Sequence, residues 1–221
     1  MCGRNSLYVH KKKLRQRYDA RLDNVWKKSY NISPGSNQPI VTKNSPKNLQ
    51  TMKWGFIPHF AETDDEKRNW RNRSLINARV ETVEEKNTFR KSFQKRKCLI
   101  PSTGFYEWKD EGRPNKTPYH IKPSNRKVFS FAGFYNDETF VILTKESENS
   151  KMADIHDRTP VILPIDKEEK YLDGEISKED LEGLEATELE IKQVSREVND
   201  PENDSKDVLK PESKQSSLSN L

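Results

Sequence analysis

The feature that most constrains the fold of this sequence is a series of short apolar segments between residues 98 and 163. They are rich in β-branched and aromatic residues and are separated by glycine, proline, asparagine or aspartate, which is typical of strands joined by turns. We expect strands at residues 98–100, 104–109, 119–122, 128–134, 139–144 and 159–163. Because a parallel pair needs a crossover of about a dozen residues, these strands should pair mainly antiparallel.

Helical patterns and further extended segments flank this series. We expect helices at residues 11–17 and 81–96, and two short acidic helices at residues 166–171 and 177–184. Ser177 followed three residues later by Asp180 favours a capped helix start. Extended segments are expected at residues 38–42, 52–58, 75–77 and 189–194, and an exposed loop at the charged segment 61–73.

Length and composition fit one domain with a solvated end. The chain has 221 residues, of which 31% are hydrophobic and 34% charged, so much of its length should lie at the surface. We expect a domain over residues 1–210 and a polar, disordered tail over residues 211–221. No segment approaches the roughly 18 apolar residues of a membrane span, and no secretory signal is present, so we expect an intracellular protein.

Cysteine and histidine usage disfavours a disulfide and a metal site. The two cysteines are Cys2 and Cys98, and the apolar neighbours of Cys98 favour a buried free thiol in a reducing compartment. The four histidines are scattered and no CxxC motif occurs, so we expect neither a metal nor another cofactor.

Charge is distributed unevenly along the chain. Residues 165–221 contain 8 Lys or Arg and 17 Asp or Glu, a net charge of −9, so the overall +5 leaves +14 on residues 1–164. A basic body with an acidic end is typical of proteins that bind a polyanion, and nucleic acid is the commonest such partner inside cells. A lysine-rich surface without any ligand is the alternative.

Cys2 has the most distinctive chemistry of the candidate residues. Removal of Met1 would give Cys2 a free α-amine beside its thiol, groups with ordinary pKa values of about 7.7–8.0 and about 8.5. Such a pair captures an aldehyde, because the amine forms an imine and the thiol then closes onto the same carbon to give a thiazolidine. The alternative is an ordinary residue near a frayed chain end.

Two further residues could take part in proton transfer. Glu107 alternates with Phe105 in an expected strand, and a carboxyl on the inward face would have a raised pKa suited to acid/base catalysis. Alternatively, Glu107 faces solvent while Tyr106 and Trp108 pack inside. His156 precedes an expected strand and is either a proton shuttle or a surface histidine.

Arginines and aromatic residues are candidates for nucleic-acid contacts. Arg79 and Arg158 could hold phosphates in a bidentate manner, or could simply be solvated. Trp54 is either a core residue or a base-stacking platform, and Phe60, beside the charged segment, is the better candidate for an exposed aromatic that contacts a base.

Several segments, taken in order, resemble one family. They are CGR at 2–4, WGFIP at 54–58, NARVET at 77–82, CLIPSTGFYEW at 98–108, AG at 132–133 and IHDRTPVIL at 155–163. This series resembles the motifs of the SOS response-associated peptidase (SRAP) family, whose members sense abasic sites in single-stranded DNA and crosslink to them through the terminal cysteine. The resemblance extends from Cys2 to about Pro211.

The resemblance implies a role for each site residue. Glu107 would open the sugar and move protons, Asn77 would hold the Cys2 amine, and His156 would hydrogen-bond the released sugar oxygen and assist reversal. Contacts to DNA are expected from Arg4, Arg79, Arg158, Trp54 and Phe60. Ser102-Thr103 departs from the small-acidic pair often found before the glycine in this family.

The resemblance also implies a fold and a function. The fold is a single α+β domain whose curved, mainly antiparallel sheet forms a barrel-like core with surrounding helices. The function is DNA repair, by shielding abasic sites in single-stranded DNA through a covalent thiazolidine crosslink, with lyase activity and autopeptidase removal of Met1. We expect a monomer without cofactor, in the cytoplasm with the nucleoid or, in a eukaryote, in the nucleus. A thiol peptidase and a non-covalent nucleic-acid reader are the alternatives.

Overall fold

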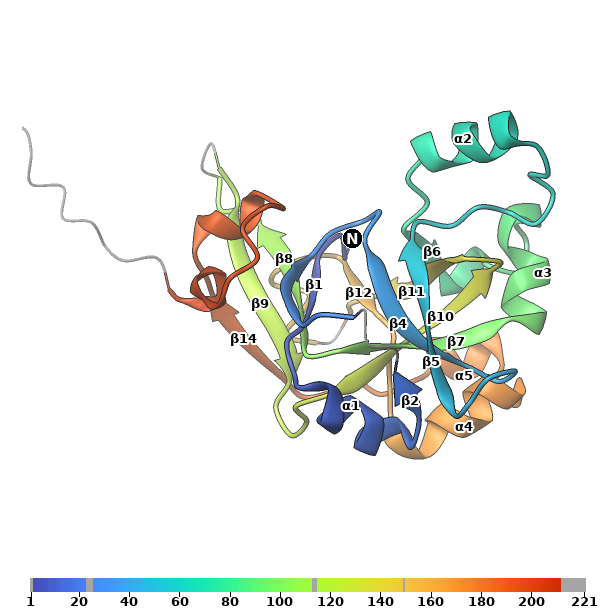
Figure 1. The fold of residues 1–221 in the computed structure, drawn as a ribbon. Helices are drawn as coiled ribbons and strands as arrows, with labels where there is room; N and C mark the ends of the chain where they lie inside the picture. The colour runs from blue at the N-terminus through green and yellow to red at the C-terminus, as the bar shows by residue number, and fades with distance from the viewer. Residues whose placement is uncertain (1, 23–25, 113–114, 149, 212–221) are drawn as a thin grey trace, which may run out of the picture.

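Two β-sheets with helices around them make up the α+β fold of the computed structural model (Figure 1). The structure describes residues 2–22, 26–112, 115–148 and 150–211. The smaller sheet has the strand order β14-β9-β8-β1-β3, and all its pairings are antiparallel. Its strands are β1 (Asn5–Leu7), β3 (Ser29–Ile32), β8 (Gly104–Lys109), β9 (Thr117–Pro123) and β14 (Leu189–Gln193).

The larger sheet curves until its strands form a ring. Its order is β12-β11-β10-β7-β4-β5-β2, with β13 paired to β10 and β6 to β11. A further pairing of β11 with β5 makes β11, β10, β7, β4 and β5 an uninterrupted ring of neighbours. Its strands are β2 (Arg21–Leu22), β4 (Asn37–Thr42), β5 (Asn48–Trp54), β6 (Asn77–Arg79), β7 (Lys97–Ser102), β10 (Phe129–Asn136), β11 (Thr139–Glu146), β12 (Arg158–Pro160) and β13 (Ile162–Leu163). The expected curved, mainly antiparallel sheet is therefore confirmed.

Helices lie around the sheets. They are α1 (Lys11–Tyr18), α2 (Asp64–Asn72), α3 (Asn87–Lys95), α4 (Ile165–Asp173) and α5 (Lys178–Glu182), with 3-10 turns η1 (Val80–Thr82), η2 (Arg196–Asn199) and η3 (Lys206–Leu209). Phe89 and Phe93 of α3 pack edge-on against Phe134 of β10, with ring centroids 5.6 and 6.0 Å apart. This packing confirms the helical spacing read from the sequence. Among the described residues, no helix has the length and apolar character needed to cross a membrane.

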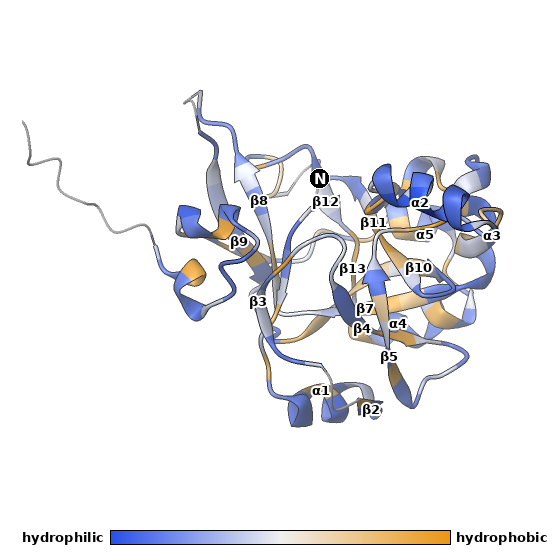
Figure 2. Ribbon diagram, turned by 45° about the horizontal axis from the view of Figure 1, so that its top comes forward, coloured by the Kyte–Doolittle hydropathy of each residue, from blue (hydrophilic) through white to orange (hydrophobic). Residues whose placement is uncertain are grey.

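The hydrophobic core has two parts. A large cluster includes residues of the ring strands and Phe105 of β8, and a small one gathers Tyr106 with valines of the C-terminal segment. Figure 2 shows hydrophobic residues on the ring strands β7 and β10, whereas α1 and α2 are mostly hydrophilic. Strand β8 lies between the two clusters, so both of its faces are buried.

Some expected elements differ from the structure. Segment 61–73 contains the helix α2, because Thr63 accepts a hydrogen bond from Glu66 N–H while the Glu66 carboxylate accepts one from Thr63 N–H. Since α2 buries no residue, it has no apolar periodicity to reveal it. The expected helix 81–96 is the turn η1 followed by α3, and the expected strand 159–163 is divided into β12 and β13. Residues 212–221 of the predicted tail lie outside the described residues.

Candidate functional site

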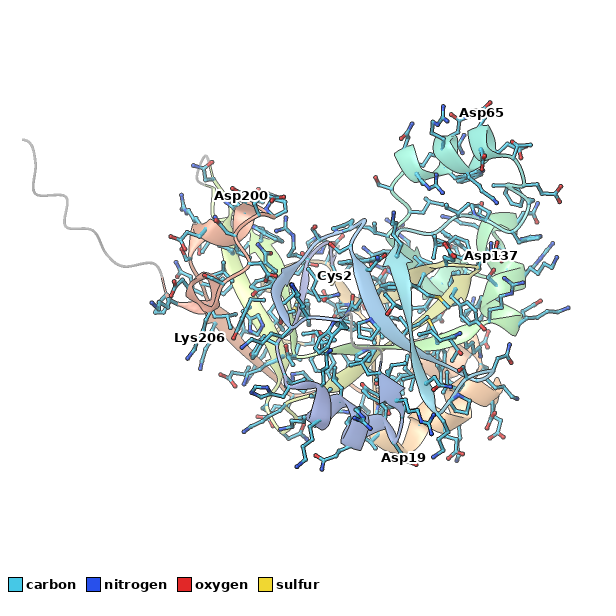
Figure 3. All side chains as sticks on the ribbon, in the orientation of Figure 1. Cys2, Asp19, Asp65, Asp137, Asp200 and Lys206 are labelled. Atoms are coloured by element: carbon cyan, nitrogen blue, oxygen red, sulfur yellow. The ribbon has the colours of Figure 1, made fainter. Side chains whose placement is uncertain are left out.

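Strand β1 brings the N-terminal residues alongside Glu107. The β1–β8 register pairs Asn5 with Phe105, and the backbone N–H of Tyr106 donates to the Arg4 carbonyl over 2.9 Å. The same register sets Gly3 opposite Glu107, with Cys2 one residue further. Figure 3 shows Cys2 between the smaller sheet and the ring. Residues 2–4 therefore run alongside β8 just before the first strand of the sheet.

The Cys2 side chain is buried, with only 1% of the residue exposed. Its Sγ lies 3.8 Å from the Arg4 carbonyl oxygen. Burial raises the pKa of the Cys2 thiol, and the negative charge of Glu107 raises it further. The thiol is accordingly held in its protonated form.

Asn77 fixes the Cys2 backbone. It lies on β6, which pairs parallel with β11 at Ile142, and its Nδ2 donates to the Cys2 carbonyl over 2.8 Å. The Asn77 Oδ1 atom is buried and accepts no hydrogen bond from any residue that the structure describes. A buried acceptor without a donor is costly, so this position favours a group that carries an N–H.

Glu107 lies on the same face of β8 as Phe105, and this face is inward, the first of the two alternatives left open by the sequence. The residue is 3% exposed, and burial is the main cause that raises the pKa of its carboxyl from 4.5 to about 7. Tyr106 and Trp108 pack on the opposite face, in the smaller cluster. A carboxyl with this pKa can both donate and accept a proton at neutral pH.

His156 lies in the turn before β12 with 28% of its side chain exposed. Its Nδ1 lies 2.6 Å from Asp157 Oδ1 and 3.0 Å from the backbone nitrogen of Arg158, which fixes the orientation of the ring. Burial lowers the pKa of His156 and favours the neutral imidazole. Apart from burial, Asp157 raises and Lys116 lowers the pKa of both His156 and Glu107, so the two groups share one electrostatic environment.

Two of the three candidate arginines make contacts within the fold. Arg158 is 6% exposed and pairs with both Glu81 oxygens over 2.8 and 2.9 Å. Arg4 Nη1 donates to Asn31 Oδ1 and to the Val198 carbonyl, each over 2.8 Å, and so joins β1 to β3 and η2. Arg79 is exposed at the end of β6 and forms no ion pair with a described residue.

The two candidate aromatic residues have opposite environments. Trp54 is fully buried, stacks on Phe140 at 6.4 Å and donates through Nε1 to the Ile76 carbonyl, so it is the core residue of the two alternatives and its ring is closed to a base. Phe60 is 44% exposed and packs edge-on against Trp70, with ring centroids 5.6 Å apart. Phe60 therefore keeps an accessible ring, as expected.

Comparison with known proteins places this fold and these motifs in one family. The family model described as SOS response associated peptidase (SRAP) matches residues 1–201. The chain belongs to the SRAP family. The SRAP chain is 37% identical over 232 residues to the abasic site processing protein YoaM of Bacillus subtilis, covering 96% of this chain and 99% of that protein.

Two other similar proteins come from Xenopus tropicalis and Bacteroides thetaiotaomicron. The SRAP chain is 30% identical over 192 residues to the abasic site processing protein HMCES of Xenopus tropicalis, covering 69% of this chain and 56% of that protein. A crystal structure of a protein from Bacteroides thetaiotaomicron matches with a TM-score of 0.79 and 29% identity, covering 90% of this chain and 97% of that one.

Some features of the SRAP site were not anticipated from the sequence. Lys116 and Asp157 act on both Glu107 and His156, yet only Asp157 adjoins a candidate residue in the sequence. Lys116 lies just before β9 and has no local signal. Asn31 was also missed, although its Nδ2 donates to the carbonyls of three C-terminal residues.

Proposed function

We propose that this SRAP chain captures abasic sites in single-stranded DNA as a covalent thiazolidine formed by Cys2. Relatives that cover nearly the whole chain are named abasic site processing proteins, which supports an abasic sugar as the target. The proposal depends mainly on one observation, the buried Glu107 carboxyl with a pKa of about 7 beside the Cys2 thiol. Removal of Met1 is part of the proposal, because the α-amine must be free.

The proposed reaction joins one aldehyde to one aminothiol and releases one water. The Cys2 amine adds to C1′ of the ring-opened sugar, and the C1′–O bond breaks as the oxygen leaves in water, which gives an imine. The sulfur then adds to the same carbon, and the thiol proton ends on the ring nitrogen. The atoms balance without an oxidant or a reductant.

Glu107 and Asn77 suit the proton transfers of this sequence. Because the pKa of Glu107 is about 7, its acid form can protonate the leaving oxygen and its carboxylate can then accept the thiol proton. The thiol needs such a base because burial raises its own pKa. The buried Asn77 Oδ1 is suited to accept a hydrogen bond from the amine or the ring N–H.

The remaining candidate residues would bind the sugar and the DNA around the lesion. The neutral imidazole of His156 would hydrogen-bond the sugar oxygen and assist reversal, which would be the lyase step. Exposed Arg79 would hold a phosphate beside the lesion and Phe60 would stack on a base, whereas Arg4 and Arg158 would bind phosphates only after releasing their present partners. A protein that captures such lesions should be found with the DNA of its cell.

A denaturing gel tests the proposal directly. The full chain is incubated with single-stranded DNA that carries one abasic site, and a shifted band is expected for the wild type and for the Cys98→Ser control, which keeps Cys2. The band should vanish for Cys2→Ala. Cys2→Ala and Cys2→Ser both keep the α-amine, so each should give a band only when borohydride reduces the imine. A shifted band that persists in Cys2→Ala without borohydride would refute the proposal.

The same variants separate the two alternatives. Equal affinity for intact and abasic DNA, unchanged in Cys2→Ala and without a covalent band, would favour a non-covalent reader. Cleavage of unrelated peptides by the wild type but not by Cys2→Ala would favour a thiol peptidase.

A further inference from the structure

Helix α1 is a strongly basic helix on the surface. Five of its eight residues are Lys or Arg and none is acidic. Only Leu14 is buried, and it anchors the helix in the main core. Figure 1 shows α1 and β2 at the lower edge of the molecule, away from the N label near its middle, and Figure 2 shows that α1 is mostly hydrophilic.

Part of the positive charge on α1 has a structural role. Arg17 pairs with Glu168 of α4 over 2.6 Å, and the next residue, Tyr18, hydrogen-bonds Ser130 Oγ over 2.9 Å. These contacts and Leu14 hold the helix in place. Lys12 and Arg15 form no ion pair with any described residue, so no acidic side chain of the described fold neutralises their charges.

Lys12 and Arg15 line a hollow between α1 and the following strand, β2. Arg21 N–H donates to the Lys47 carbonyl over 2.7 Å, which sets the start of β2 beside the segment before β5. The resulting hollow of about 820 Å³ is lined by Lys12, Arg15, Gln16, Asp19, Ala20, Arg21 and Lys47. Its acidic residue, Asp19, is paired with Lys47. Within the described chain, Lys12, Arg15 and Arg21 therefore present three uncompensated positive charges to one hollow.

The sequence of α1 opposes the stability of an isolated helix. Its first turn holds three lysines and no acidic residue, although the helix dipole favours negative charge there. Lys12 and Arg15 are also like charges three residues apart, which repel one another on a helix surface. A bound polyanion would offset both unfavourable interactions, because it is attracted to each of these positive charges and to the helix N-terminus.

We propose that the hollow between α1 and β2 is a second nucleic-acid contact, which binds the phosphate backbone of DNA away from Cys2. Three grouped cations are best suited to bind phosphates of the DNA backbone. The net positive charge of residues 1–164 attracts DNA in the same way. The chain from Cys2 to Lys11 reaches at most about 30 Å when extended, so one DNA strand that continues beyond the lesion can contact both places. The contact goes beyond the proposed function because it does not involve Cys2.

Salt dependence of binding to intact DNA tests the contact. The full chain carrying Lys12→Gln, Arg15→Gln and Arg21→Gln is compared with the wild type by fluorescence anisotropy, using single-stranded DNA without an abasic site. Lys86→Gln, Lys95→Gln and Lys206→Gln form the matched control, since they remove three exposed cations from other surfaces. Equal thermal midpoints verify that each variant is folded.

Loss of three phosphate contacts should reduce the log–log salt slope by about 2 and lower affinity about 100-fold near 0.1 M salt, whereas the control should change it little. Crosslinking at saturating abasic DNA should persist in the α1 variant. Equal affinity of this variant and the wild type, or an equal loss in the control, would overturn the contact. The contact would also be overturned if the α1 variant bound DNA as well as the wild type does but bound phosphatidylserine vesicles more weakly. If no crosslink forms but the slope falls, the proposed function fails and this contact stands.

Discussion

Replacement of Glu107 by glutamine should stabilise the fold at alkaline pH. The residue is 3% exposed, and burial raises the pKa of its carboxyl from 4.5 to about 7 on folding. Because the folded pKa is the higher one, the unfolded chain releases this proton first. The protonated Glu107 carboxyl therefore makes its full contribution to the unfolding free energy below about pH 4.5. This contribution is lost as the pH rises through about 7. This difference corresponds to about 3 kcal/mol of unfolding free energy.

Urea denaturation at pH 5 and pH 8 measures this effect. The Glu107→Gln variant should exceed the wild type by about 1 kcal/mol at pH 5 and by about 3 kcal/mol at pH 8, because glutamine remains neutral at both. The comparison between the two pH values cancels changes in packing that the amide introduces. The same variant should lose crosslinking, since glutamine transfers no proton.

An exposed glutamate provides the control for this measurement. Glu138 is exposed, so the difference in unfolding free energy between Glu138→Gln and the wild type should be the same at pH 5 and pH 8. If the advantage of Glu107→Gln were also independent of pH, Glu107 would not be a carboxyl whose pKa is raised by burial. The assignment of Glu107 as the proton-transfer group would then lose its physical basis.

Three other changes test the surrounding structure. Gly104→Ala should lower the unfolding free energy in urea by about 1–3 kcal/mol, because the added Cβ would lie 2.1 Å from His120 Nε2. Unchanged stability would contradict this packing. Arg158→Ala should destabilise the protein by about 1–3 kcal/mol, because the partly exposed Glu81 loses its bidentate partner. A thermal scan showing no loss would show that this pair is unimportant. Phe60→Ala should weaken binding to single-stranded DNA by about 1–3 kcal/mol in anisotropy titrations, and equal affinity would rule out stacking.

The strands of the ring could be predicted from the sequence because their residues are nearly all buried. β10 and β11 are buried over most of their length, so continuous runs of β-branched and aromatic residues identify them. Helix α2 could not be found in this way, because none of its residues is buried and only the capping pair Thr63 and Glu66 marks its start. Local chemistry stabilises that helix in place of a hydrophobic face.

The site was predicted through the order of its motifs and not through local pattern. Asn77 contacts Cys2 across 75 positions of the chain, and no periodicity predicts such a contact. The face of Glu107 stayed open because β8 is buried on both sides. The pairing of Arg158 with Glu81 could not be foreseen either, since a buried arginine and a phosphate-binding arginine have the same sequence signal.

Intact-mass and peptide analysis of the product with abasic DNA tests the central claim most directly. We expect a protein that lacks Met1 and an adduct whose mass is the sum of protein and DNA less one water, with the DNA on the N-terminal Cys2 peptide. Retention of Met1 in an adduct-forming protein, or attachment of the DNA to any other residue, would contradict it.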